Sequence, residues 1–119
     1  GFNIIKLKNW TAGEAVTAEL AGLPNESGYN SSGDASSAGW TIGFVGLSKD
    51  GQTRLYSPSS ATESGSLTTS VSWDIPSDCE ILWAVVACTP SEYITHGWDE
   101  NNSNDRHWPY KIRFVGAEL

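Results

Sequence analysis

The segment from Tyr93 to Tyr110 concentrates side chains that can bind ligands. Oxygen-bearing side chains recur within it at every second position, namely Asp99, Asn101, Ser103 and Asp105. An extended backbone would point them to one side, and Ca²⁺ takes about 6–8 oxygen ligands. These residues are therefore a candidate calcium site. The match to an EF-hand loop is partial, because the sixth-position glycine and the twelfth-position glutamate are missing, and the alternative is that the side chains close Asx-turns.

The same segment also has the composition of a sugar site. Sugar rings have apolar C–H faces that stack on aromatic side chains, and their hydroxyls need hydrogen-bonding partners. A connection of roughly 15–20 residues without secondary structure is usually functional or disordered, and the framing aromatic residues argue against disorder. The predicted ligand-binding residues are Trp98, Tyr93, Trp108, Asn101, Asn102 and Arg106. The alternative for Trp108 is an anchor that packs on the core where the next strand begins.

The other four tryptophans are assigned from their neighbours in the sequence. Trp83 lies in the middle of an apolar run, which predicts a core position. Trp40 and Trp73 alternate with polar residues and share their faces with other apolar side chains, so they are also predicted to be core. Trp10 lies at a turn, and it is an additional candidate for a ligand-binding platform.

The chain carries no Gly-x-Ser-x-Gly elbow, no His-Glu-x-x-His motif and no P-loop. A carboxylate pair such as Asp99 with Glu63 or Glu92 remains conceivable. A glycosidase, however, holds two carboxylates roughly 5–9.5 Å apart across a substrate cleft, and a sandwich of 119 residues seldom builds one. We therefore predict that the protein is not an enzyme.

Alternating apolar and polar residues dominate the chain and predict an all-β fold. An Asp50-Gly51 pair marks a hairpin between two of the expected strands. Residues 1–119 are expected to form one antiparallel β-sandwich domain of about seven strands, either jelly-roll or immunoglobulin-like. The predicted strands are 2–8, 14–21, 40–48, 52–57, 66–73, 80–89 and 110–115.

The net charge of −7 and the absence of a Lys/Arg cluster argue against nucleic-acid and anionic-membrane partners. Cys79 and Cys88 stand at the two ends of a predicted strand, so roughly 30 Å separates them, and no disulfide can span that distance. Both are expected to be reduced and buried. Because the sequence begins at Gly1 without a signal peptide, we expect a module excised from a larger protein.

Residues 96–110 resemble a motif of C-terminal β-sandwich modules in secreted bacterial proteins, His-x-Trp-Asp-Asp-Asp-x-Ser-Asn-Asp-x-x-Trp-Pro-Tyr. The segment Leu82 to Pro90 resembles the part of those modules that precedes the motif. Such modules often follow hydrolase or peptidase domains and are similar to carbohydrate-binding modules. The resemblance implies a bacterial source and a secreted, extracellular or cell-surface location. The chain departs from the motif at Glu100 and Asn101, which would weaken a cation site.

Together these patterns predict a non-catalytic carbohydrate-binding module that targets an appended enzyme to a polysaccharide or glycan. No cofactor is required, although Ca²⁺ is possible. The expected partners are the glycan and the neighbouring domains of a modular protein, with no nucleic acid and no membrane. The alternative is a structural or interaction sandwich whose long loop is stabilised by turns or Ca²⁺.

Overall fold

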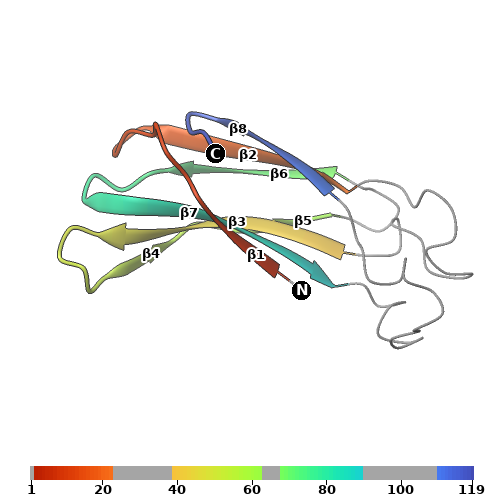
Figure 1. The fold of residues 1–119 in the computed structure, drawn as a ribbon, viewed down its shortest axis with the longest axis horizontal. Coiled ribbons are helices and arrows are strands. Elements are labelled where there is room, and N and C mark those ends of the chain that lie inside the picture. The colour runs from red at the N-terminus through yellow and green to blue at the C-terminus, as the bar shows by residue number, and fades with distance from the viewer. Residues whose placement is uncertain (1, 23–38, 63–67, 90–109) are drawn as a thin grey trace, which may run out of the picture.

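The computed structural model describes residues 2–22, 39–62, 68–89 and 110–119, and these residues form an all-β sandwich of two antiparallel sheets (Figure 1). This confirms the predicted fold class. The seven predicted strands all occur, with ends within two residues of the prediction, and β5 is an additional short strand. The strands are β1 (Phe2–Lys6), β2 (Ala15–Gly22), β3 (Gly39–Ser48), β4 (Arg54–Tyr56), β5 (Ser60–Ala61), β6 (Thr68–Asp74), β7 (Cys79–Thr89) and β8 (Tyr110–Val115).

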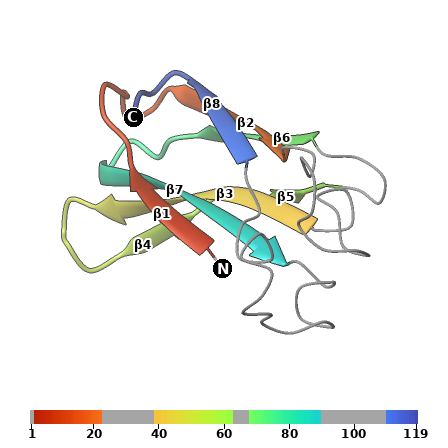
Figure 2. The ribbon, with the colours of Figure 1, turned by 45° about the vertical axis from the view of Figure 1, so that its right-hand side comes forward.

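The larger sheet has the strand order β1-β7-β3-β4, with β5 also paired to β3, and the smaller sheet has the order β6-β2-β8. In an immunoglobulin-like sandwich, strand C lies between strands C′ and F, and strand B lies beside strand E. In the same way, β3 lies between β4 and β7 here, and β2 lies beside β6. The terminal strands are exchanged, because here the first strand pairs with β7 and the last with β2. Both lie along one side of the sandwich (Figure 2), where Asn3 Nδ2 donates a hydrogen bond to Tyr110 Oη at 2.8 Å.

The core lies between the two sheets and follows from strand alternation. In β3, Trp40, Ile42 and Phe44 are buried, while the residues between them turn outward. The same alternation in β2 and β7 supplies most of the remaining core. Those residues are Val16, Ala18, Leu20, Leu82, Ala84 and Val86.

The predicted core positions of Trp40 and Trp73 are confirmed. Trp40 is fully buried, and Trp73 is half-buried against the core, where its ring stacks on Phe44 with centroids 6.4 Å apart. The prediction for Trp83 is wrong. Trp83 is half-buried on the outer face of the larger sheet, because β7 alternates Leu82 and Ala84 inward and Trp83 outward. An apolar run predicts a central strand, but it does not show that both faces of that strand are covered.

Cys79 is a free, buried thiol, as predicted, and the side chain of Cys88 lies outside the described residues. Burial raises the pKa of the Cys79 thiol, and the nearby Asp78 carboxylate adds to this effect. The thiol also packs closely on the neighbouring strand, because a Cβ added to Gly46 would lie 2.7 Å from its Sγ. Cys79 therefore acts as a small core residue rather than a reactive nucleophile.

The predicted hairpin at Asp50 and Gly51 is confirmed between β3 and β4. The carboxylate of Asp50 accepts hydrogen bonds from the Gln52 and Thr53 backbone amides at 2.8 and 2.9 Å. It also accepts one from the Thr53 hydroxyl at 3.0 Å and one from the Ser48 hydroxyl. The Ser48 bond, followed by the other three, lowers the pKa of Asp50 far below its ordinary value of 3.8. The charged form of Asp50 therefore holds the turn together.

We expect Asp50→Asn to remove part of the pH dependence of stability. Because the folded pKa of Asp50 is depressed, its contribution is present above the unfolded value of 3.8 and is lost as pH falls toward the lower folded value. Urea unfolding between pH 6 and pH 2 should give a shallower acid decline for Asp50→Asn than for the unchanged protein. Asp74→Asn, at an exposed position in β6, is the matched control, and an equal effect of both substitutions would contradict the assignment.

Gly116→Ala tests the turn that follows β8. Gly116 has φ of +87°, and an added Cβ would lie 2.5 Å from the Ala15 carbonyl oxygen. Strain and clash together should lower the free energy of unfolding by about 2–3 kcal/mol. Gly51→Ala is the control, because Gly51 has φ of +71° but no atom within 4 Å of the added Cβ. It should cost only about 1 kcal/mol in urea unfolding, and equal losses would show that the close approach to Ala15 is unimportant.

Candidate functional site

Most of the predicted site residues lie outside the described residues. They are the ligand-binding candidates Tyr93, Trp98, Asn101, Asn102, Arg106 and Trp108 and the metal candidates Asp99, Asn101, Ser103 and Asp105. The strands that lead to and from residues 90–109 are nevertheless placed. The register pairs Gly39 with Thr89, and Gly22 with Tyr110, at one pole of the sandwich. The segment that carries the sugar and calcium predictions is therefore attached at this pole.

Two further segments are attached at the same pole. β2 ends there at Gly22 and β3 begins there at Gly39, so both ends of residues 23–38 lie at this pole. The second segment is residues 63–67. β5 ends and β6 begins at the same pole, because Thr41 pairs with Ala61 and Ala21 pairs with Thr68 (Figure 1). Loops gathered at one end of a β-sandwich are the usual place for ligand-binding residues.

Trp10 is the one predicted ligand-binding residue that the structure describes. It precedes Ala15, the end of β2 opposite Gly22, and it follows the bridge between Lys8 and Glu118, so it lies toward the opposite pole. Its indole Nε1 donates a hydrogen bond to the Leu7 carbonyl at 3.2 Å, and its half-buried ring packs against the core. The structure does not bring Trp10 to the pole where the other candidates attach.

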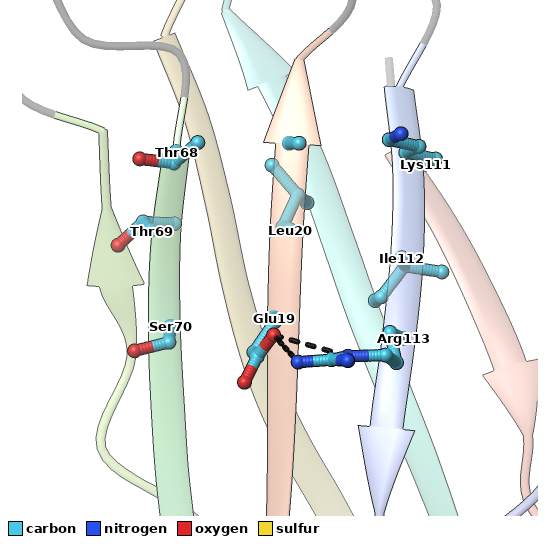
Figure 3. A pocket seen from close by; sticks show the side chains of 9 residues that line it. Glu19, Leu20, Thr68, Thr69, Ser70, Lys111, Ile112 and Arg113 are labelled. Carbon is cyan, nitrogen blue, oxygen red and sulfur yellow. Dashed lines mark hydrogen bonds and ion pairs between the residues drawn. The ribbon is translucent and has the colours of Figure 1, made fainter.

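A trough with both polar and apolar lining lies on the outer face of the smaller sheet, next to the pole where residues 90–109 attach (Figure 3). It encloses about 600 Å³ and runs across β6, β2 and β8. Two cross-strand rows contribute the outward side chains, because Glu19 pairs with Ser70 and Arg113, and Ala21 pairs with Thr68 and Lys111. The trough therefore presents hydroxyl groups on β6, a carboxylate on β2, and guanidinium and ammonium groups on β8.

An ion pair spans the middle of the trough. Arg113 Nε lies 3.1 Å from Glu19 Oε2, and Arg113 Nη2 bonds to the same oxygen. The two side chains are 72% and 45% exposed, so the pair itself adds little to stability. It does place a donor and an acceptor side by side, facing solvent. This arrangement can bind a ligand that offers both hydroxyl donors and oxygen acceptors.

The outer face of the larger sheet carries a row of side chains that the sequence analysis missed. The register aligns Lys6 with Trp83, Trp83 with Val45, and Val45 with Tyr56 across four strands. Tyr56 is 66% exposed and Trp83 half-buried. The only sequence signal for this row is the second apolar face of β7, which the analysis assigned to the core.

Within the ranges that the structure describes, no group of three or more His, Cys, Asp or Glu side chains could hold a metal ion. The calcium site predicted at residues 99–105 lies outside those ranges and stays a prediction. None of the described residues forms a helix long and apolar enough to cross a membrane.

The family model described as a family of unknown function, DUF6055, matches residues 1–119, so the chain belongs to that family. No curated protein matches the chain, and no solved structure matches it.

Proposed function

We propose that this member of the DUF6055 family is a non-catalytic carbohydrate-binding module that holds an appended enzyme near a polysaccharide or glycan. The observation that carries the proposal is the trough on the smaller sheet, where the paired Glu19 and Arg113 and the neighbouring Lys111 stand beside apolar side chains. The trough lies next to the pole where residues 90–109 attach, which supply the predicted aromatic and amide groups.

The chemistry of the trough favours a sugar over other ligands. A sugar hydroxyl both donates and accepts, so it can bond to the Glu19 carboxylate and the Arg113 guanidinium at the same time. The hydroxyls of Thr68 and Ser70 extend this surface along β6. Polyanions are poorer ligands, because Glu19 already neutralises Arg113 in the trough and the whole chain carries a net charge of −7.

The absence of catalysis in this proposal rests on the charges in the trough. Among the residues that the structure describes around the trough, Glu19 is the one carboxylate, and it is held by Arg113. Hydrolysis of a glycosidic bond needs a second carboxylate across the substrate. Calcium at residues 99–105, secretion, and the presence of an appended enzyme remain parts of the proposal.

A binding screen with soluble and insoluble polysaccharides, run with and without EDTA, tests the proposed function. We expect at least one glycan to bind. Loss of binding in EDTA would assign the affinity to a calcium-dependent site, as predicted at residues 99–105, whereas retained binding would show that the affinity needs no divalent cation. No binding to any glycan in either condition would contradict the proposed function.

Arg113→Ala tests the trough directly. Removing the guanidinium should weaken a bound soluble glycan by about tenfold, since hydrogen bonds to charged groups are worth about 1.5–3 kcal/mol. Stability should change by less than about 1 kcal/mol, because the ion pair with Glu19 is exposed. Titration calorimetry measures the first effect and urea unfolding the second.

Lys49→Ala is the control for Arg113→Ala, because it also removes one positive charge but lies in the hairpin between β3 and β4. An equal loss of affinity in both variants would indicate a general charge effect. Unchanged affinity in Arg113→Ala would remove the trough from the binding site.

A further inference from the structure

The outer face of the larger sheet is apolar and exposed. Its outward positions alternate with the core positions of β1, β7, β3 and β4, and among the described residues none forms a layer outside them (Figures 1 and 2). Ile4 is 60% exposed and Tyr56 is 66% exposed. The half-buried side chains around them are Val45, Leu47, Ile81, Trp83 and Val85.

The two aromatic residues of this face lie in one row. Trp83 pairs with Val45, and Val45 pairs with Tyr56, so two strand spacings separate the aromatic residues. That distance is roughly 10 Å. One pyranose ring with its glycosidic oxygen is about as long as one strand spacing. A sugar chain that crosses the strands would therefore place alternate rings over Trp83 and Tyr56.

Polar groups border the same row. Lys6 lies beside Trp83 at one edge, and Arg54 lies two residues from Tyr56 at the other. Hydrogen-bonding side chains thus flank an apolar centre, as sugar rings require.

The size of the face favours a polysaccharide over a protein. The four strands are spaced ~4.8 Å apart, and on average each is about seven residues long at ~3.3 Å per residue. Together they cover an area of roughly 400 Å². A stable protein partner needs about 800 Å² on each side. A second copy is also disfavoured by charge, because each copy carries a net charge of −7. The charged side chains described on or beside this face are Lys6, Arg54 and Glu80.

We propose that this outer face is a second carbohydrate surface, distinct from the trough. An extended, neutral polysaccharide lies across β1, β7, β3 and β4 and stacks on Trp83 and Tyr56. Lys6 and Arg54 donate hydrogen bonds to its oxygens. Because Ile4 and Tyr56 are exposed on an open sheet face, its ligand is the surface of an insoluble polysaccharide such as cellulose or chitin. This inference rests on the proposed carbohydrate function and assigns it a second site and a ligand class.

Depletion binding to microcrystalline cellulose and to chitin tests the inference. Tyr56→Ala should weaken binding to at least one of them by roughly fivefold, as expected for loss of an aromatic contact. The fold should persist, because Tyr56 is exposed. Arg54→Ala is the second variant and should also weaken binding. Val115→Ala is the matched control, because Val115 is 58% exposed beyond the trough on the other sheet, and it should leave binding unchanged.

The trough variant Arg113→Ala separates failure of this inference from failure of the proposed function. It should keep binding to the insoluble polysaccharides while losing soluble glycan. If Arg113→Ala loses insoluble binding and Tyr56→Ala keeps it, the outer face is not a binding site and the proposed function stands. If the unchanged protein binds neither cellulose nor chitin, the inference is overturned whether or not soluble glycans bind. Concentration-dependent self-association that Tyr56→Ala abolishes would instead identify the face as a protein interface and overturn the inference.

Discussion

The packing of β3 between its neighbours is the constraint on which the rest of the structure depends. Trp40, Ile42 and Phe44 point into the space of about 10 Å between the sheets, where they meet the buried residues of β2 and β7. Strand alternation then sends every intervening residue outward. Because the interior is filled by this core, ligand sites can form only on the two outer faces and at the poles. The trough lies on the outer face of the smaller sheet, and the row with Trp83 and Tyr56 lies on the outer face of the larger sheet.

Much of the fold could be predicted from the sequence, because alternation is a local signal. The strands containing Trp40 and Trp73 carry that signal clearly, and both side chains lie where it predicts. Trp83 shows its limit. A strand with two apolar faces is compatible with burial on both sides or with one exposed apolar face, and only the arrangement of the sheets decides between them. β5 was missed because two residues are too few to show a period.

The candidate sites were harder to predict, because they depend on pairing between distant parts of the chain. Glu19 and Arg113 are 94 positions apart and meet only through the pairing of β2 with β8. Tyr56 and Trp83 share a row only because β3 lies between their strands. Most of the ligand-binding residues predicted from the sequence are instead close together in the chain, at positions 93–108. Of the predicted ligand-binding residues, Trp10 is described, and it lies toward the opposite pole, before the start of β2.

Nuclear magnetic resonance mapping with cellohexaose tests most directly whether the outer faces of this sandwich bind carbohydrate. The account predicts that the sugar shifts backbone amide signals of β2 and β8 around Glu19 and Arg113, or the indole signal of Trp83 with the amides around Tyr56. Signals of the buried indole of Trp40 and of the half-buried Trp10 should stay unchanged. Saturating sugar that shifts no signal on either outer face would contradict the account.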